Sequence, residues 1–336
     1  MPEPIGLPVT ESSQVGDARR LATNLARNLG FDETRRGRVA LIATELATNL
    51  VKHAQDGMLV LIPIDRAGVG GLELIAIDKG PGMFDIARCM TDGFSTAGSP
   101  GNGLGAVDRL SDDFDVFSKE SGTALLARLW SAAIPPGAIL NIGAVCLPML
   151  GEEVCGDAWA TSEHDGRASV LLVDGLGHGP QAAEAAREAV RVFHDLAGAD
   201  LAEIVHAAHA AMRSTRGAVV AVAEIDPEVQ SLAFVGVGNI NARVLADGVS
   251  QSLISHNGTV GHIVRRVQEM TYPWPPGSLL VMHSDGISNH WGLDRYGSLS
   301  THDSGLIAGV LFRDFKRERD DSTVVVARSS VGEARR

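Results

Sequence analysis

A carboxylate and a carboxamide stand four residues apart near the end of a long amphipathic segment of the chain: Glu45 and Asn49. Residues four apart project from the same face of a helix. Asn49 can offer an oxygen to a magnesium ion that bridges phosphates, because magnesium prefers hard oxygen ligands. Glu45 can deprotonate a hydroxyl group or a water molecule. Taken alone, the pair is more typical of a solvated helix face, so the functional interpretation depends on the motifs that follow. The segment is predicted to be helical because the apolar residues Val39, Ile42, Leu46 and Leu50 recur three or four positions apart.

A second acidic residue follows an apolar, β-rich run. The run Gly71–Ile77 pairs in the expected hairpin with Met58–Ile64 and is followed by Asp78, with Gly80 and Gly82 close behind. A carboxylate at a strand end can accept a hydrogen bond from an adenine amino group, and the glycines leave room for the flat base. Many ordinary turns have this pattern, so the motif is weak when taken alone.

A glycine-rich passage from Asp92 to Gly105 then leads into a predicted helix. Glycine-rich loops that enter a helix N-terminus can bind phosphate through their backbone N–H groups. The passage lacks the GxxxxGK[ST] pattern of a P-loop. A flexible surface loop is the alternative interpretation. Two further strands are expected after it, with Gly122 and Thr123 between them.

In the second half of the chain, aspartates recur close to apolar runs. Each Asp-Gly pair alone is compatible with an ordinary hairpin turn. Buried strands that end in Asp can, however, bring carboxylates to one place, where they repel each other unless cations neutralise them. An all-oxygen cluster fits two Mg²⁺ or Mn²⁺ ions better than zinc, and two such ions suit phosphoryl chemistry. The aspartates are Asp157, Asp174, Asp285 and the adjacent pair Asp320 and Asp321.

Taken in order, the motifs of the first half resemble the GHKL nucleotide-binding fold, and within it the serine kinases and anti-sigma factors of the RsbW/RsbT type. The resemblance covers about residues 8–130 and is greatest to the RsbT branch. It implies ATP and Mg²⁺ as cofactors, with magnesium held by Asn49 and adenine bound by Asp78. Glu45 would be the base that activates a serine on a STAS-domain protein. The resemblance also implies a nucleotide pocket shaped by Gly80, Gly82, Gly103, Leu104, Gly105 and Thr123.

The second half resembles the metal-dependent PPM serine/threonine phosphatases, near the SpoIIE/RsbX branch, over about residues 140–328. The resemblance implies two Mn²⁺ or Mg²⁺ ions, with the backbone carbonyl of Gly175 as a further ligand. Asp321 stays ambiguous, since one of the adjacent pair usually ligates, and His178 is a candidate for contact with phosphate. The motifs are Gly-Asp at 156–157, DGLGHG at 174–179, Ser-Asp-Gly at 284–286 and Asp-Asp-Ser-Thr at 320–323. The implied carboxylate ligands are Asp157, Asp174, Asp285 and Asp320.

Composition restricts the partners. The chain has 336 residues, is 45% hydrophobic and has a formal charge of −12, and both halves are acidic. Nucleic acid and an anionic membrane surface are therefore not expected as partners. Three cysteines without metal-ligand spacing fit a reducing cytoplasm. Neither a leader segment nor a membrane span is expected, so we expect a cytoplasmic protein.

The expected fold class is α+β in two domains. Residues 1–132 would form a GHKL α/β sandwich, a mixed sheet with helices on one face. Residues 133–138 are rich in proline and small residues and would form a linker. Residues 139–330 would form a PPM-type α-β-β-α sandwich.

The expected function is that of a bifunctional regulator in a bacterial partner-switching pathway. It would phosphorylate serine on STAS-domain proteins, either an anti-sigma antagonist or a stressosome-like protein, and it would also hydrolyse phosphoserine and phosphothreonine. A sigma factor or a further regulator is a second class of partner. One alternative is an ATP-binding anti-sigma or sensor module that gates the phosphatase without kinase activity. Another is a scaffold whose phosphatase half is inactive.

Overall fold

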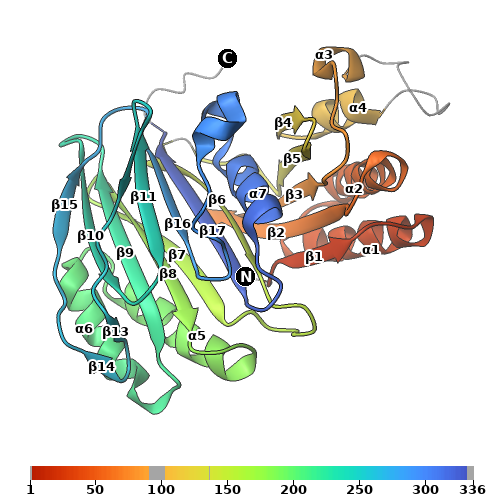
Figure 1. Ribbon diagram of the computed structural model, residues 1–336. Coiled ribbons are helices and arrows are strands. Elements are labelled where there is room, and N and C mark those ends of the chain that lie inside the picture. The colour runs from red at the N-terminus through yellow and green to blue at the C-terminus, as the bar shows by residue number, and fades with distance from the viewer. Residues whose placement is uncertain (1, 91–102, 136, 331–336) are drawn as a thin grey trace. The chain divides into compact units, whose positions relative to one another are not determined.

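A computed structural model describes residues 2–90, 103–135 and 137–330, and these form two compact units (Figure 1). Unit 1 comprises Met1–Pro136 together with Thr301–Arg313, and unit 2 comprises Gly137–Ser300 and Asp314–Arg336. The expected α+β class in two domains is confirmed. The domain limits 1–132 and 139–330 remain predictions, and they did not anticipate that residues 301–313 group with the first unit. No described helix is both long and apolar enough to span a membrane.

Unit 1 is built on one five-stranded sheet with the strand order β1-β2-β3-β5-β4. All of its pairings are antiparallel, where a mixed sheet was expected. The reason is local, because short hairpins join β2 to β3 and β4 to β5. The strands are β1 (Ile5–Pro8), β2 (Met58–Arg66), β3 (Val69–Ile77), β4 (Asp113–Lys119) and β5 (Gly122–Trp130), and the helices from the first part of the chain are α1 (Ser12–Asn28), α2 (Glu33–His53), α3 (Ile86–Cys89) and α4 (Gly103–Leu110).

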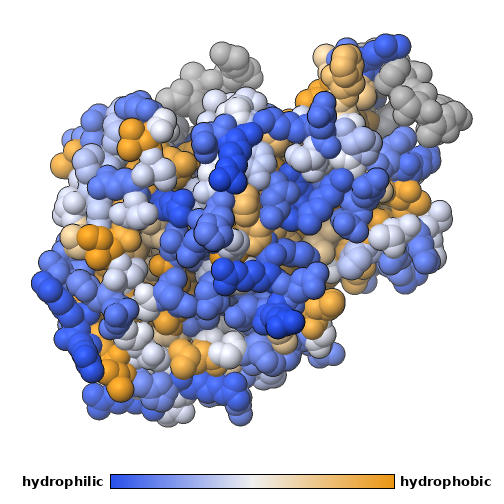
Figure 2. All heavy atoms as spheres, in the orientation of Figure 1, coloured by the Kyte–Doolittle hydropathy of each residue, from blue (hydrophilic) through white to orange (hydrophobic). Residues whose placement is uncertain are grey.

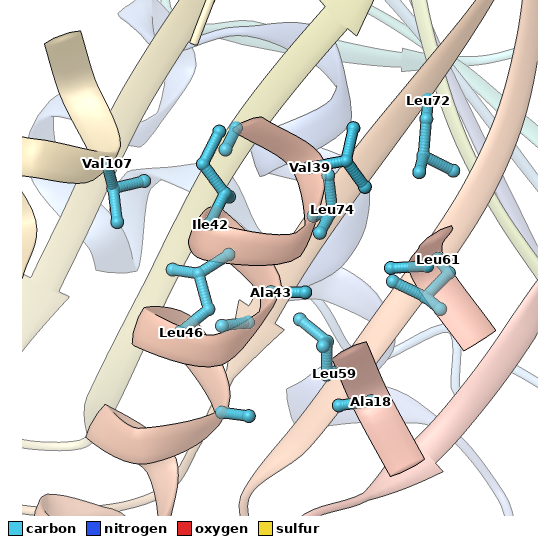
Figure 3. Packing of buried hydrophobic residues seen from close by; sticks show 14 of the residues in the cluster. Ala18, Val39, Ile42, Ala43, Leu46, Leu59, Leu61, Leu72, Leu74 and Val107 are labelled. Carbon is cyan, nitrogen blue, oxygen red and sulfur yellow. The ribbon is translucent and has the colours of Figure 1, made fainter. Parts of the chain in front are cut away.

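Helix α2 positions the first candidate pair. It begins after Asp32, whose side chain accepts a hydrogen bond from the backbone N of Arg35 at 2.7 Å, a standard N-cap. Its apolar face packs into the core between α1, α2 and the sheet (Figure 3). Because Ile42 and Leu46 are fully buried there, Glu45 and Asn49 lie at the half-buried edge of the helix.

The two faces of the unit 1 sheet are covered by different parts of the chain. Leu72, Leu74 and Ala76 of β3 belong to the core beneath α1 and α2. Their neighbours must point to the other face, because side chains alternate along a strand. That face is covered by α7 (Ser304–Phe315): a Cβ at Gly305 would lie 2.6 Å from Oε1 of Glu73, and one at Gly309 would lie 2.9 Å from Cγ2 of Ile75.

A buried ion pair fixes residues 301–313 to this face. Glu73 and Arg128 are direct cross-strand partners on β3 and β5. Nη2 of Arg128 lies 2.5 Å from Oε2 of Glu73 and 2.9 Å from Oδ1 of Asp303. Asp115 accepts the backbone N–H of Asp303 at 2.8 Å, and its other oxygen lies 2.9 Å from Nδ1 of His302. The negative charges of Glu73 and Asp303 keep the pKa of the Arg128 guanidinium raised despite burial, which acts in the opposite direction.

We expect Arg128→Met to destabilise the protein by about 3–5 kcal/mol, because it leaves the buried Glu73 carboxylate and Asp303 without their shared cation. Differential scanning calorimetry would measure the change. Arg191→Met is the matched control, since Arg191 forms its pairs with Glu188 and Asp195 on the exposed side of a helix, and it should leave the unfolding transition unchanged. Equal behaviour of the two variants would contradict the structural role given to Arg128.

Unit 2 contains two five-stranded sheets, with the orders β15-β10-β9-β8-β7 and β12-β11-β16-β17-β6, and a small two-stranded ribbon. The first sheet and its helices comprise β7 (Asp157–His164), β8 (Arg167–Gly175), α5 (Pro180–Asp195), α6 (Leu201–Ala211), η1 (Met212–Ser214), β9 (Ala218–Asp226), β10 (Ser231–Val237) and β15 (Met270–Pro273). The remaining elements are β6 (Leu140–Leu147), β11 (Asn241–Ala246), β12 (Val249–Ser252), β13 (Gly258–Thr259), β14 (Ile263–Val264), β16 (Leu279–His283), η2 (Leu293–Thr301) and β17 (Ser322–Ser329).

The core of unit 2 lies between its two sheets. Leu172 of β8 and Phe234 of β10 meet Met282 of β16 and Val325 of β17 in one buried cluster. A second cluster packs α5 and α6 on the outer face of the first sheet, through Leu171 and its neighbours. This is the sandwich of two sheets flanked by helices that the apolar runs predicted.

The surface fits the acidic, polar composition. Figure 2 shows a face on which hydrophilic residues predominate and hydrophobic residues occur in small, scattered groups. Scattered apolar residues of this kind are normal on a monomeric protein surface and mark no binding area by themselves.

Candidate active sites

The pair on helix α2 faces the start of helix α4. A Cβ at Gly103 would lie 3.8 Å from Oε2 of Glu45 and 3.9 Å from Oδ1 of Asn49. Both polar side chains thus point toward the glycine-rich segment, as binding of a nucleotide phosphate between them requires. Gly105 is buried and Leu104 packs against the core, which fixes the first turn of α4. The predicted loop residues Asp92–Asn102 lie outside the described residues.

Asp78 lies directly after β3 in a half-buried position. Its Oδ1 accepts the backbone N–H of Gly80 at 2.6 Å, and its own backbone N donates to the carbonyl of Thr123 at 3.0 Å. Burial raises the pKa of the Asp78 carboxyl, and hydrogen bonds from the backbone of Gly80 and Thr123 lower it to a smaller extent. The carboxyl is therefore held in place by backbone groups, as a residue that recognises one edge of a base must be.

Close backbone packing around Asp78 requires glycine at two positions. A Cβ at Gly122 would lie only 2.0 Å from the carbonyl oxygen of Asp78, and a Cβ at Gly82 only 2.0 Å from that of Lys119. Both glycines also have positive φ angles, of 133° and 72°. The hydroxyl of Thr123 lies 2.9 Å from that of Ser118, which in turn accepts the backbone N–H of Met83 at 2.7 Å. The structure thus brings Asp78, Gly82 and Thr123 together, as the sequence predicted.

In unit 2, neighbouring strands bring two of the predicted carboxylates side by side. Asp157 begins β7 and is the register partner of Asp174 near the end of β8. The backbone N–H of Asp285 lies near the Asp174 carboxyl and acts to lower its pKa. Burial, followed by the charges of Asp157, Asp285 and Asp320, raises the pKa of Asp174 to about 9. Burial likewise raises the pKa of Asp157 to about 7, with Asp321 and Asp320 contributing. Carboxylates crowded in this way are stabilised by bound cations.

The other two predicted ligands are linked to each other. Asp320 shares a side-chain hydrogen bond with Asp285, and burial together with the Asp285 charge raises the pKa of Asp320. Asn239 donates from Nδ2 to Oδ2 of Asp285 at 2.9 Å. Within the described ranges, no three His, Cys, Asp or Glu side chains converge tightly enough to form a metal site by themselves. The chemistry of the donors, four crowded carboxylates, nevertheless fits hard divalent cations.

The adjacent residue Asp321 has a different role from Asp320. Both of its oxygens accept backbone N–H groups, Oδ1 from Met149 at 2.7 Å and Oδ2 from Gly156 at 2.8 Å, and the side chain is buried. Asp321 therefore fixes the turn that precedes Asp157. Of the ambiguous pair, Asp320 is the one whose carboxylate faces the other aspartates.

Several supporting residues were not predicted from the sequence. Thr323 donates from its hydroxyl to Oδ2 of Asp157 at 2.8 Å, and Ser284, like Thr323, acts to lower the pKa of Asp157. Both lie inside the motifs already singled out, so their proximity could have been inferred. Asn239 could not, because it follows β10 and nothing in its local sequence connects it with Asp285.

His178, a candidate for contact with phosphate, lies at the exposed rim of the same site. Its Nδ1 is 2.6 Å from Oε1 of Glu152, so a carboxylate orients the ring. Gly179 then caps helix α5 with a positive φ of 75°. The structure places His178 beside the DGLGHG turn and leaves its contact with phosphate a prediction.

Fold and sites together define a class: a two-domain chain with a kinase-like nucleotide-binding domain followed by a domain with the PPM-type phosphatase fold. Residues 8–129 match the histidine kinase-like ATPase domain family, and residues 164–329 match the Stage II sporulation protein E (SpoIIE) family. Over 114 residues the chain is 40% identical to the serine/threonine-protein kinase RsbT of Bacillus subtilis (strain 168), covering 34% of this chain and 86% of RsbT. The chain belongs to the RsbT family through its first domain.

The chain has further relatives. The chain is 24% identical over 139 residues to the phosphoserine phosphatase RsbX of the same organism, covering 41% of this chain and 70% of RsbX. A structure from work on the bacterial stressosome matches with a TM-score of 0.53 and 28% identity, covering 57% of this chain and 100% of that chain. RsbX in complex with magnesium matches with a TM-score of 0.51 and 21% identity, covering 58% and 98%, and this shows the fold alone.

Proposed function

We propose that the chain both phosphorylates and dephosphorylates serine on STAS-domain proteins of a bacterial partner-switching pathway. The observation that supports this most is that each half of the chain brings together a set of side chains suited to one of the two reactions. Glu45 and Asn49 face Gly103 in unit 1, and Asp157 pairs with Asp174 in unit 2. Similarity to a protein kinase over one half and to a phosphoserine phosphatase over the other supports the opposed activities.

In the kinase reaction, Glu45 takes the proton of the substrate serine hydroxyl. The serine oxygen then bonds to the γ-phosphorus of ATP while the bond to the β,γ-bridging oxygen breaks, and ADP leaves. Asn49 would hold the Mg²⁺ that accompanies the phosphates, and Asp78 would hold the adenine. Catalysis here depends on positioning and charge neutralisation rather than on a covalent enzyme intermediate.

In the phosphatase reaction, water attacks the phosphorus of phosphoserine, the P–O bond to serine breaks, and the serine oxygen takes up a proton. Asp157, Asp174, Asp285, Asp320 and the carbonyl of Gly175 would hold two Mg²⁺ or Mn²⁺ ions. Such ions supply activation of water and stabilisation of phosphoryl charge when bound. The protein keeps the ligands in place through Asn239, which holds Asp285, and Thr323, which holds Asp157.

The proposal is tested by incubating the full chain with ATP and candidate STAS-domain proteins of the same genome. Intact-mass spectrometry would follow the gain of one phosphate in Mg²⁺ and ATP, and its loss after ATP is removed and Mn²⁺ is added. A substrate that is phosphorylated by this chain and never dephosphorylated by it would contradict the bifunctional proposal.

A second candidate function, nucleotide gating of the phosphatase, is favoured by the contacts of helix α7. Within unit 1, Nη1 of Arg313 donates to the carbonyl of Asp78 at 3.2 Å. Within unit 2, the backbone N of Arg317 donates to the carbonyl of Gly286 at 2.7 Å, directly after Asp285. Arg313 and Arg317 are only four positions apart in the sequence. A change at the adenine-binding turn could therefore bias the turn that carries a metal ligand.

If this gating operates, ATP should change Mn²⁺-dependent hydrolysis of a phosphoserine peptide by about fivefold or more. Arg313→Gln should remove that response while ATP binding persists, because it weakens the contact to Asp78. Arg265→Gln, on an exposed loop, is the control. Isothermal titration calorimetry would check binding, and a response to ATP that survives in Arg313→Gln would count against this route.

A further inference from the structure

Arg216 lies beside the DGLGHG turn of unit 2. The pairing of β8 with β9 aligns Asp174 with Val219 and Gly175 with Ala218. The alignment continues past the strand ends, since the backbone N of Leu176 donates to the carbonyl of Gly217 at 3.0 Å. The next step brings Arg216 opposite Gly177. A Cβ at Gly177 would lie 3.1 Å from Nη1 of Arg216, so the guanidinium rests against the turn.

The backbone of Arg216 is fixed from the other side. Nε2 of His262 lies 2.7 Å from the carbonyl oxygen of Arg216. The following residues are tied to the β13–β14 ribbon, because Ala218 and Val260 exchange two backbone hydrogen bonds at 3.0 and 2.8 Å. A side chain that starts from an anchored backbone needs less ordering to bind a ligand, which favours affinity.

The guanidinium itself has no acidic partner within residues 2–90, 103–135 and 137–330. Arg216 is exposed, and among the residues that the structure describes its guanidinium forms no hydrogen bond or ion pair. Two other arginines of unit 2, by contrast, have partners: Arg167 pairs with Glu224, and Arg243 lies over the ring of Trp291. An arginine held next to a cluster of carboxylates without pairing to any of them has its full donor capacity available.

The net negative charge of the aspartate site makes a cationic side chain such as Arg216 favourable beside it. The four candidate ligands and the buried Asp321 carry five negative charges when ionised, and two divalent cations supply four positive ones. The net charge of about −1 would repel a phosphate ester dianion. An arginine at the rim reverses this locally, and its planar fork matches two phosphate oxygens at once.

We propose that Arg216 binds the phosphoryl group of the substrate at the phosphatase site. This assignment rests on the proposed phosphatase function and gives the site a recognition element for phosphate monoesters. Arg216 is a substrate-binding residue, and the aspartates remain the candidate metal ligands. An acidic side chain of a protein substrate is the other anion that Arg216 could meet, and the experiment separates the two.

The test compares Arg216→Ala and Arg216→Lys with the parent chain. The matched control is Arg213→Ala, which removes an exposed arginine three residues earlier, in η1. Hydrolysis of p-nitrophenyl phosphate and of a phosphoserine peptide gives kcat and KM at saturating Mn²⁺. Calorimetry measures binding of Mn²⁺ alone, and then of inorganic phosphate to the Mn²⁺-loaded protein.

For Arg216→Ala we expect KM for both substrates, and the Kd of inorganic phosphate, to rise by about 10- to 100-fold, as loss of hydrogen bonds to a charged group does. The affinity for Mn²⁺ should not change. Arg216→Lys should show an intermediate loss, and Arg213→Ala should match the parent. Unchanged phosphate binding in Arg216→Ala, or a defect confined to the peptide, would overturn the assignment. Absence of hydrolysis and of Mn²⁺ binding in the parent chain would instead refute the phosphatase proposal itself.

Discussion

Asp174→Asn should lower the rate of Mn²⁺-dependent phosphoserine hydrolysis by about 10³-fold or more. The substitution removes one charge from the group of crowded carboxylates, where Asp174 is the register partner of Asp157 and interacts electrostatically with Asp285 and Asp320. Divalent cations lower the barrier of phosphoryl transfer by several kcal/mol, so weakening their hold affects the rate strongly. Steady-state hydrolysis of a phosphoserine peptide would measure the effect.

When a chelator removes divalent cations, Asp174→Asn should make the folded protein more stable, although it lowers activity in their presence. Folding raises the pKa of Asp174 from the ordinary value of 3.8 to about 9, and that of Asp157 to about 7. Between the ordinary and the raised pKa, each carboxyl holds a proton in the folded protein that the unfolded chain releases. Raising the pH through that window therefore destabilises the metal-free protein. Asp174→Asn should raise its Tm at pH 8 by at least about 2–4 °C, the shift that corresponds to 1 kcal/mol in a domain of this size.

Asp195→Asn is the control, because this exposed aspartate pairs only with Arg191 in the contacts described. It should change neither hydrolysis nor the metal-free Tm. An Asp174→Asn protein that retains full activity would remove Asp174 from the metal site. A lower Tm in chelator would show instead that the crowded carboxylates do not repel each other.

Glu45→Gln should reduce phosphate transfer from ATP to a STAS-domain protein by about 10²- to 10⁴-fold, the usual contribution of a positioned general base. ATP binding should persist, because adenine recognition is assigned to Asp78 and the magnesium to Asn49. The amide of glutamine fills the same space beside Gly103 and cannot take up the serine proton. Phosphorylation would be followed with radiolabelled ATP in single-turnover conditions, and binding by calorimetry.

Glu33→Gln gives the matched control on the same helix, since Glu33 lies in the exposed first turn of α2. It should leave both transfer and binding unchanged. Undiminished transfer in Glu45→Gln would refute the role of Glu45 as the general base. ATP binding without any phosphate transfer by the parent chain would refute the kinase assignment itself and favour the gating function.

The two sites differ in how far the sequence could predict them. The strand ends that carry Asp157 and Asp174 were predictable, since apolar runs bound them and both belong to ordered motifs. Helix α2 was predictable for the same kind of reason: an aspartate cap, helical spacing and a basic last turn agree. Such signals are local, and a single sequence displays them directly.

The sequence could not predict that residues 301–313 cover the second face of the unit 1 sheet. Glu73 and Arg128 alternate with apolar residues on β3 and β5, and their partner Asp303 is 175 residues beyond Arg128. In a single sequence, charged residues that alternate with apolar ones predict a solvated face of the sheet, and nothing local indicates that the segment with Asp303 covers it. The contact between Asn239 and Asp285 is of the same kind, because only the order of strands in space brings the two loops together.

The consequence of opposed activities in one chain is net hydrolysis of ATP, unless one activity is held back while the other operates. The contacts of α7 with the Asp78 turn in unit 1, and of residues just beyond α7 with the Gly286 turn in unit 2, offer one physical route for such control. Such control needs little free energy, since a ligand that binds one of two states a few kcal/mol more tightly is enough to shift the equilibrium between them.

The central claim is that one chain both adds and removes the same phosphate. The most direct measurement is intact-mass spectrometry of a single STAS-domain protein incubated with the full chain, Glu45→Gln and Asp174→Asn, first with Mg²⁺ and ATP and then with Mn²⁺ after ATP is removed. The account predicts that the full chain adds and then removes one phosphate, that Glu45→Gln adds none, and that Asp174→Asn adds a phosphate that persists. Removal of the phosphate by Asp174→Asn at the rate of the full chain, or its addition by Glu45→Gln, would contradict it.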